Sequence, residues 1–469
     1  MLSNFFTTQI KKNFPHETTS EQNLALEKLS NFLFSKANDS LFVLKGYAGT
    51  GKSSLIGALV KTMNDMKQKT VLMAPTGRAA KVFSFYAEQN AYTIHKKIYR
   101  QKAFSNEPTG FTLSDNLHKH TIFIVDEASM ISNDGLDSFS FGSGRLLDDL
   151  IHYVYSGEAC RLLLTGDSAQ LPPVSQPDSP ALDLENLKGY NLEIHDVTFT
   201  QVVRQNEISG ILLNASLLRT AITENKVDIF PRLITKNQSD VIVVRGDELV
   251  EFIENSYNRV GMEETIIITR SNKRANVFNN GIRNRILYRE DSLSSGDLLM
   301  VSKNNYFWGR EEQKNIDFIA NGDLMEVLRV RRIEEIYGFK FADLLVRFPD
   351  YDLEMELKIV MESLFSDAPS LPKEQNDKLF YTILEDYADI PTKAERMKRM
   401  KDNPYYNAVQ VKYAYAVTCH KAQGGQWKNV FLDISYVPAE YLGLDFYRWL
   451  YTAFTRATEK IFLINPIVA

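Results

Sequence analysis

The chain has 469 residues, of which 44% are hydrophobic and 24% are charged, as in ordinary globular proteins. This length exceeds what one core normally organises, so several domains are expected. The net charge of −5 disfavours a uniformly basic surface but permits a local basic channel. Two cysteines, Cys160 and Cys419, are too few for a disulfide framework or a zinc cage and fit a reducing compartment. No apolar run is long enough to cross a membrane and no basic leader precedes an apolar core, so we expect a cytoplasmic protein without a membrane partner.

The first predicted helix covers residues 20–34, where apolar side chains recur at helical spacing. Thr19 or Ser20 would cap its start. Gln22 lies in the first turn of this helix, and taken alone it is a polar residue of a helix start.

The second feature is a glycine-rich loop. A short apolar run over residues 41–45 leads into Gly46-Tyr-Ala-Gly-Thr-Gly51-Lys52-Ser53, and a helical pattern follows. A strand before and a helix after are the context that a phosphate-binding loop requires, whereas an ordinary glycine-rich turn needs neither. Lys52 would reach the β- and γ-phosphates, and the Ser53 hydroxyl would bind Mg²⁺. The sequence therefore predicts a nucleoside triphosphate site with these loop residues: Gly49, Thr50, Gly51, Lys52, Ser53 and Ser54.

Further β-favouring runs over residues 70–74, 121–125 and 161–165 alternate with helical patterns. This alternation predicts a doubly wound parallel sheet that binds its ligand at the carboxyl ends of the strands. Asp126 and Glu127 follow one strand, where Asp126 would hold Mg²⁺ and Glu127 would orient or deprotonate the attacking water. Gln170 follows the next strand, within reach of a γ-phosphate. The alternative for the two acids is an ordinary acidic turn, which the upstream phosphate loop disfavours.

A second sheet domain is predicted to start at Val197, with strands over residues 240–244 and 265–269. From about Gly296 the apolar residues alternate at short spacing, as in a small antiparallel barrel, and charged helices follow. The basic run at 393–401 either contacts a nucleic-acid backbone or forms a solvated helix face, and we favour the second. A parallel pattern resumes near residue 410. The expected domains are 1–196 with a hairpin insertion at 96–119, 197–295, an insertion at 296–408, and 409–469.

Eight short motifs stand in a characteristic order: GYAGTGKSS, APTGRAAK, TIHK, DEAS, GDSAQLPPV, VVRQ, VTCHKAQGG and LYTAFTRA. In these motifs the chain resembles superfamily 1 helicases of the 5′-to-3′ class, above all the Dda-type phage helicases and their RecD-like relatives, over residues 22–456. The resemblance implies an α/β fold with two RecA-like parallel-sheet P-loop domains. It also implies a small β-hairpin insertion in the first domain and an SH3-like β-barrel with a helical insertion in the second.

The resemblance assigns roles to further residues. Gln22 would hydrogen-bond the adenine edge, Gln423 and Gly424 would line the nucleotide site, and Arg204 and Arg456 would act as arginine fingers. It places the nucleic-acid strand on the following residues: Pro75, Thr76, Arg78, Thr93, His95, Thr418, His420 and Lys421. His95 taken alone is more often a structural histidine.

Two aromatic residues of the hairpin insertion, Phe104 and Phe111, are candidates for the wedge that splits a duplex, and hairpin packing is an equal alternative. The chain departs from many RecD-like proteins at Gln426, where an acid is common, which puts a coupling role of that position in doubt. No nuclease-type carboxylate cluster or zinc-type Cys/His set is evident in the sequence.

We expect an ATP- and Mg²⁺-dependent helicase that moves 5′ to 3′ on single-stranded DNA. Its partners would be single-stranded DNA, junctions of single and double strands, and replication or recombination proteins, and it would act as a monomer near the nucleoid. One alternative is an RNA helicase of the same superfamily, which only 2′-OH recognition would distinguish. Another is a DNA-binding recruitment subunit with a vestigial ATPase. The presence of Lys52, Glu127, Gln170, Arg204 and Arg456 argues against that alternative.

Overall fold

The computed structural model describes residues 2–35, 37, 39–101, 111–135, 142–203, 209–308, 319–350, 352–435 and 438–465. Its contacts divide the chain into two compact units. Unit 1 contains the described residues up to Gln238 together with Pro438–Thr455. Unit 2 contains Ser239–Val437 and the residues from Arg456 onward. The chain thus passes between the units after residues 238, 437 and 455. None of the described helices is both long and apolar enough to cross a bilayer.

Unit 1 is built on a six-stranded parallel sheet with the order β3-β2-β6-β7-β1-β8. Parallel strands place all their carboxyl ends at one edge, so the loops that follow them converge there. A separate antiparallel hairpin of β4 and β5 lies within the predicted insertion at 96–119 and confirms it. The strands of unit 1 are β1 (Ser40–Gly46), β2 (Lys69–Ala74), β3 (Ala91–Thr93), β4 (Tyr99–Gln101), β5 (Phe111–Leu113), β6 (Thr121–Val125), β7 (Arg161–Gly166) and β8 (Glu193–Phe199).

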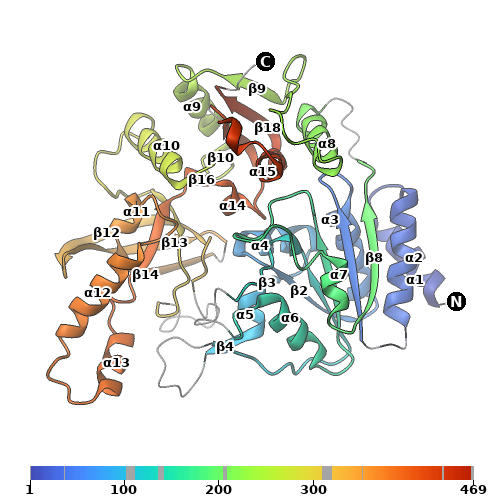
Figure 1. Cartoon of the computed structure of the whole chain (residues 1–469), viewed down its shortest axis with the longest axis horizontal. Helices are drawn as coiled ribbons and strands as arrows, with labels where there is room; N and C mark the ends of the chain where they lie inside the picture. Colours follow the sequence, from blue (N-terminus) through green and yellow to red (C-terminus); the bar gives the residue numbers. More distant parts are fainter. Residues whose placement is uncertain are drawn as a thin grey trace. The chain divides into compact units, whose positions relative to one another are not determined.

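Helices cover both faces of this sheet because alternate residues of a strand point to opposite sides. On β6, Ile122 and Ile124 pack in the core formed with α1 to α4, whereas the ring of Phe123 contacts Tyr153 of α6. Figure 1 shows α1 and α2 beside the edge strand β8. The helices of unit 1 are α1 (Leu2–Asn13), α2 (Ser20–Phe34), α3 (Lys52–Asp65), α4 (Gly77–Ala87), α5 (Ile94–Ile98), η1 (Ala128–Met130), α6 (Leu146–Tyr155), α7 (Leu184–Lys188), α8 (Gly210–Thr223), η2 (Ala439–Tyr441) and α15 (Leu444–Phe454).

The predicted start of a second domain at Val197 is wrong. Val197 lies in β8, where it pairs with Leu44 of β1 in the first sheet. Unit 1 continues through α8 to Gln238 and takes up α15 as well. The alternating pattern around Val197 correctly indicates a strand, but alternation alone cannot say which sheet a strand joins.

Unit 2 contains a five-stranded parallel sheet with the order β16-β10-β17-β18-β9. The predicted parallel strands near residues 241–244 and 265–269 are therefore confirmed. Its strands are β9 (Val241–Val244), β10 (Thr265–Thr269), β16 (Ala416–Thr418), β17 (Trp427–Asp433) and β18 (Ala457–Ile464), and its helices are α9 (Leu249–Val260), α10 (Asn272–Arg285) and α14 (Cys419–Ala422).

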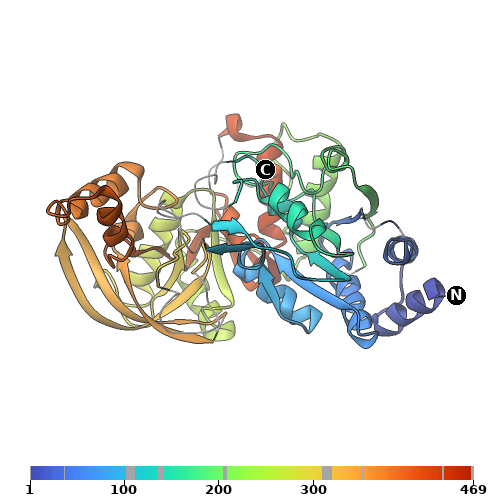
Figure 2. The same cartoon turned by 90° about the horizontal axis from the view of Figure 1, so that it is seen from below.

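Unit 2 also contains a closed five-stranded barrel, which confirms the predicted barrel insertion. Its strands are β11 (Leu298–Val301), β12 (Leu324–Ile336), β13 (Phe339–Phe348), β14 (Leu353–Val360) and β15 (Val409–Tyr413), and α11 (Glu362–Phe365), α12 (Lys373–Glu385) and α13 (Lys393–Lys401) lie between β14 and β15. Figure 2 shows the long curved strands of the barrel with α12 and α13 beside them. One expectation is wrong here: residues 409–413 close the barrel, and the second sheet resumes only at Ala416.

A buried ionic network connects α10, the barrel and the second sheet. The Asp297 carboxylate is fully buried and accepts from Arg283 Nε at 3.0 Å and from Arg289 Nη1 at 2.7 Å. It also accepts from the Tyr415 hydroxyl at 2.9 Å and from the Ser294 amide at 2.8 Å. Because the buried guanidinium of Arg283 and the partly buried guanidinium of Arg289 both pair with this carboxylate, its removal leaves positive charge without compensation.

We therefore expect Asp297→Ala to lower the free energy of unfolding by about 3–5 kcal/mol, measured by urea denaturation. The matched control is Asp247→Ala, which removes the exposed partner of Arg245. An exposed pair contributes about 0–1 kcal/mol, so this variant should unfold almost like the parent protein. Equal midpoints for the two variants would contradict a structural role for the network.

Candidate nucleotide and nucleic-acid sites

The glycine-rich loop connects β1 to α3. Gly49 and Gly51 have φ angles of 77° and 85°, which side chains other than glycine rarely adopt. The Lys52 ammonium donates to the carbonyl oxygens of Gly46 and Tyr47, the latter at 3.0 Å. The lysine side chain is thus folded back onto its own loop. The N-terminus of α3, whose first backbone N–H groups have no partner within the helix, faces the same loop, as a phosphate-binding site requires.

Gln22 contacts this loop from α2. Its side-chain oxygen accepts from the Thr19 amide at 3.0 Å in a capping box, and its Nε2 donates to the Thr50 carbonyl at 3.1 Å. A Cβ atom on Gly51 would lie only 2.7 Å from that Nε2, so the glycine makes room for the contact. Gln22 is therefore next to the phosphate loop, and its role at an adenine edge stays a prediction.

The two acids follow β6 at the same edge of the sheet. The Asp126 amide donates to the Met73 carbonyl of β2 at 3.0 Å, which fixes the start of the turn. Glu127 has a φ angle of 53°, an uncommon conformation for a residue with a side chain and one that often marks functional sites. The Tyr86 phenol donates to the Asp126 carboxylate, and the neighbouring Ser53 opposes the rise in the pKa of that phenol. Ser53 and Asp126, predicted to hold Mg²⁺, are therefore both neighbours of Tyr86.

The Asp167–Gln170 turn follows β7. The Asp167 carboxylate accepts from the Ala169 amide at 2.9 Å and from the Tyr451 hydroxyl at 2.6 Å. That hydroxyl in turn accepts from the Ala48 amide of the phosphate loop at 2.9 Å. The side-chain oxygen of Gln170 is buried and has no hydrogen-bond partner among the described residues. An unpaired amide oxygen at the edge of this cavity can accept a hydrogen bond from water or from a ligand that donates one.

Neither Tyr86 nor Tyr451 is among the site residues predicted from the sequence. Tyr451 belongs to the motif LYTAFTRA, so attention to polar residues of that motif besides Arg456 could have singled it out. Tyr86 lies in α4 beyond the end of the motif APTGRAAK, and no sequence signal points to it. Burial and the neighbouring carboxylates raise the pKa of both phenols well above 10, so both remain hydrogen-bond donors.

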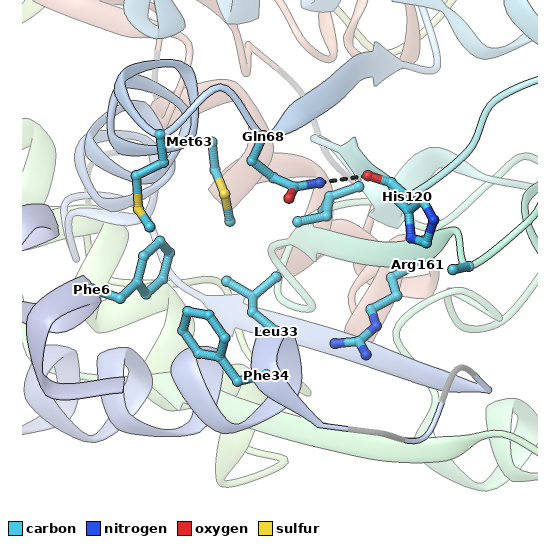
Figure 3. Close-up of a pocket in the computed structure, with 10 residues that line it drawn as sticks. Phe6, Leu33, Phe34, Met63, Gln68, His120 and Arg161 are labelled. Carbon is cyan, nitrogen blue, oxygen red and sulfur yellow. Dashed lines mark hydrogen bonds between the residues drawn. The ribbon is translucent and has the colours of Figure 1, made fainter. Parts of the chain in front are cut away.

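Among the cavities of unit 1, two lie at different edges of the sheet. One of about 320 Å³ adjoins Gln170, Asp167 and Ser129. The other, of about 220 Å³, is lined by Phe34, Arg161 and their neighbours (Figure 3). Arg161 is the first residue of β7, so the second cavity lies at the amino ends of the strands and is not the nucleotide site.

The nucleic-acid candidates of unit 1 follow two neighbouring strands, since Ala74 at the end of β2 pairs with Thr93 at the end of β3. The structure thus brings these candidates to one stretch of the sheet edge: Pro75, Thr76, Arg78, Thr93 and His95. The hydroxyls of Thr76 and Thr93 accept from backbone amides and cap α4 and α5. Phe111 is only 8% exposed, which fits packing in the hairpin better than a wedge. Phe104 and the expected finger Arg204 lie outside the described residues.

The candidates of unit 2 lie at the end of β16 and in α14: Thr418, His420 and Lys421. The Lys421 ammonium is buried without a hydrogen-bond partner in the described part of the chain, and burial together with Lys412 lowers its pKa to about 8. A buried ammonium of this kind favours an anionic ligand. Gln423 is the C-cap of the same helix, and Gly424 follows it. Arg456 is only 3% exposed and donates to the Gly425 carbonyl at 3.2 Å.

Burial lowers the pKa of His95 to about 4, so its imidazole is neutral at pH 7. In the unfolded chain the pKa is about 6.5, and on acidification the unfolded state therefore binds a proton first. We expect the stability that the neutral ring contributes to be lost as the pH falls from 6.5 to 4. His95→Gln should show a shallower fall in unfolding free energy over this range. The same slope in both proteins would contradict the assignment.

Comparison with known proteins agrees with this geometry. Residues 18–232 match the family model of an AAA domain, and residues 413–464 match that of a UvrD-like helicase C-terminal domain. Over 152 residues the chain is 32% identical to the ATP-dependent RecD2 DNA helicase of Deinococcus radiodurans. This alignment covers 32% of this chain and 18% of that protein. It is 22% identical to the uncharacterized protein R530 of Acanthamoeba polyphaga mimivirus, over 94% of this chain and 98% of that one.

One similar solved structure shows two coordinating Pif1 helicases at forked double-stranded DNA. The alignment covers 97% of this chain and 93% of the chain in that structure, with 15% sequence identity and a TM-score of 0.48. The AAA domain, the helicase C-terminal domain and the RecD2 likeness carry the assignment. These matches support a superfamily 1 helicase that is similar to the RecD-like enzymes.

Proposed function

We propose that the chain is an ATP-driven translocase and helicase that moves 5′ to 3′ along single-stranded DNA and opens duplexes at junctions. The observation that carries the proposal is the single sheet edge in unit 1. There, the Tyr86 phenol donates to Asp126, and the Tyr451 hydroxyl joins the Ala48 amide of the phosphate loop to Asp167. In this proposal the first sheet and the second sheet are the two motor domains, and the hairpin and the barrel are their insertions.

The residues of unit 1 fit ATP with Mg²⁺. The hydroxyl of Ser53 and the carboxylate of Asp126 are oxygen donors, which Mg²⁺ prefers, and the nucleotide and water would supply the other ligands. Within the described residues, no group of three or more His, Cys, Asp or Glu side chains could hold a metal. A cation that arrives with the nucleotide needs no such group. Bound Mg²⁺ would neutralise charge on the transferred phosphoryl group.

The protein groups would divide the chemistry among them. Lys52 would bind the β- and γ-phosphates, and Glu127 would orient or deprotonate the attacking water. Gln170 would report the γ-phosphate through the N–H groups of its side-chain amide, which can donate to phosphate oxygens. Arg204 and Arg456 would complete the site as arginine fingers when the motor domains close, and such fingers contribute about 10³–10⁵-fold in rate.

Helix α15 offers a path for coupling hydrolysis to movement. It belongs to unit 1, where Tyr451 contacts the phosphate loop and the Thr452 hydroxyl accepts from the Leu171 amide at 2.9 Å. Two residues after this helix ends, Arg456 begins the final segment of unit 2. A change at the phosphate loop would thus reach the expected finger through a short covalent connection.

DNA contact would use the threonine, histidine and lysine side chains at the carboxyl edges of both sheets, which suit sequence-independent contact with a backbone. Alternating grip by the two motor domains would then produce directional movement. The name of the D. radiodurans relative, a DNA helicase, favours DNA over RNA, and the order of the motifs favours 5′-to-3′ polarity.

Glu127→Gln tests the catalytic assignment. Removing the carboxylate should lower DNA-stimulated ATP hydrolysis by about 10²–10⁴-fold, because an amide cannot accept the proton of the attacking water. Steady-state ATPase assays measure this loss, and fluorescent ADP binding should remain. The matched control is Glu185→Gln on the exposed face of α7, which should hydrolyse ATP like the parent. Parent-like turnover by Glu127→Gln would remove Glu127 from the mechanism.

The substrate is tested by ATPase stimulation with DNA or RNA oligonucleotides and by strand displacement on duplexes with a single-stranded tail at either end. We expect stimulation by DNA and displacement only from a 5′ tail. Stimulation by RNA alone would favour the RNA helicase alternative. Binding of DNA without any turnover would favour a recruitment subunit.

A further inference from the structure

We propose that Glu21 is a positioning residue for the phosphate loop and acts through residues 200–203, which follow β8. The inference rests on the proposed ATPase function and adds a residue that belongs to none of the eight motifs. Glu21 lies in the first turn of α2, directly before Gln22. Two adjacent side chains of one helix thus support the loop. Gln22 contacts it directly at Thr50, and Glu21 holds the segment that runs beside it.

The Glu21 carboxylate fixes the start of segment 200–203. One of its oxygens accepts from the Thr200 amide at 2.7 Å and from the Gln201 amide at 3.0 Å, and the other accepts from the Thr200 hydroxyl. Burial alone would raise the pKa of Glu21. The hydrogen bonds from Gln201 and Thr200 and the charge of Arg219 outweigh burial and hold that pKa below its usual value. The carboxylate is therefore ionised at neutral pH, the form that accepts hydrogen bonds most strongly.

Arg219 of α8 holds the same segment at its first carbonyl group. Its guanidinium donates to the Thr200 carbonyl at 3.2 Å, while the amide of the same residue donates to Glu21. The guanidinium carbon also lies 4.7 Å from the centre of the Tyr47 ring, a cation–π contact with the phosphate loop. Thr200 is therefore held by two charged side chains, one of which also contacts the loop.

The end of segment 200–203 is attached to the phosphate loop itself. The Val203 amide donates to the Gly49 carbonyl at 2.9 Å. A Cβ atom added to Gly49 would lie 3.3 Å from a side-chain carbon of Val202, so the loop and the segment are in close contact. Gly49 belongs to the turn whose backbone N–H groups are expected to bind phosphate, and its orientation therefore affects those groups. A shift of the segment that Glu21 anchors would reach the phosphate site.

A carboxylate that only stabilised the fold would make the same hydrogen bonds, so the two roles need different readouts. Loss of a purely structural carboxylate lowers the free energy of unfolding and leaves the ligand affinity of the folded protein unchanged. Loss of a positioning carboxylate weakens the binding of phosphate groups. The weakening should be equal for a ligand with a base and for one without, because Glu21 acts on the loop and not on adenine.

The test measures displacement of fluorescent ADP from the intact chain by ADP and by inorganic tripolyphosphate, both with Mg²⁺. Glu21→Ala should weaken both ligands by the same factor of about 3–10, as expected for the loss of one net hydrogen bond. Arg219→Ala removes the other support of Thr200 and should weaken both ligands in the same direction. It decides the question if Glu21→Ala does not fold.

The matched control is Glu362→Ala in the barrel insertion. Glu362 also lies in the first turn of a helix and accepts from a backbone amide of another segment, that of Lys340 at 2.8 Å. The control should bind ADP and tripolyphosphate like the parent. Urea denaturation of each variant shows how much stability it has lost and that folded proteins are being compared.

Parent-like tripolyphosphate affinity in Glu21→Ala, or a loss confined to ADP, would overturn the inference and leave the ATPase proposal standing. Failure of the parent protein itself to bind ADP with Mg²⁺ would overturn both.

Discussion

The hydroxyl of Tyr451 connects the segments that form the candidate nucleotide site. It accepts from the Ala48 amide of the phosphate loop and donates to Asp167, so it joins the loop after β1, the turn after β7 and the late helix α15. Tyr451 and Asp167 are each 1% exposed, and a buried polar group that loses its partner costs about 1–3 kcal/mol. The conformation of the phosphate loop therefore depends on a helix close to the other end of the sequence.

The sheet order explains why one tyrosine can serve both segments. β1 and β7 are neighbours in the sheet, as are β7 and β6, and β6 and β2. Adjacent parallel strands therefore place the phosphate loop, Gln170, Asp126 and Thr76 in succession along one edge. The residues expected to bind nucleotide and those expected to bind DNA lie along the same sheet edge, so under the proposed function a change in nucleotide state would reach the DNA contacts without a large rearrangement of unit 1.

Much of this arrangement could be predicted from sequence because its signals are local. The phosphate loop, the acids after residues 121–125 and the barrel strands each depend on short-range patterns. The strand at Val197 and the strand at Val409–Tyr413 were predicted as strands but assigned to the wrong neighbours, because alternation specifies a strand and not its partner. Tyr86 and Tyr451 were missed because their partners lie 40 and 403 residues away in the sequence.

The separation of 403 residues between Ala48 and Tyr451 has a consequence during synthesis. At roughly 5–20 residues per second, a ribosome needs about 20–80 s to travel from one to the other. During this interval the first sheet can form, but the Tyr451 hydroxyl that accepts a hydrogen bond from the Ala48 amide has not yet been synthesised. Unit 1, although it is encoded first, is completed only when α15 emerges, after the barrel and most of the second sheet have been made. A nascent chain stalled before α15 should thus carry the glycine-rich loop without its final support.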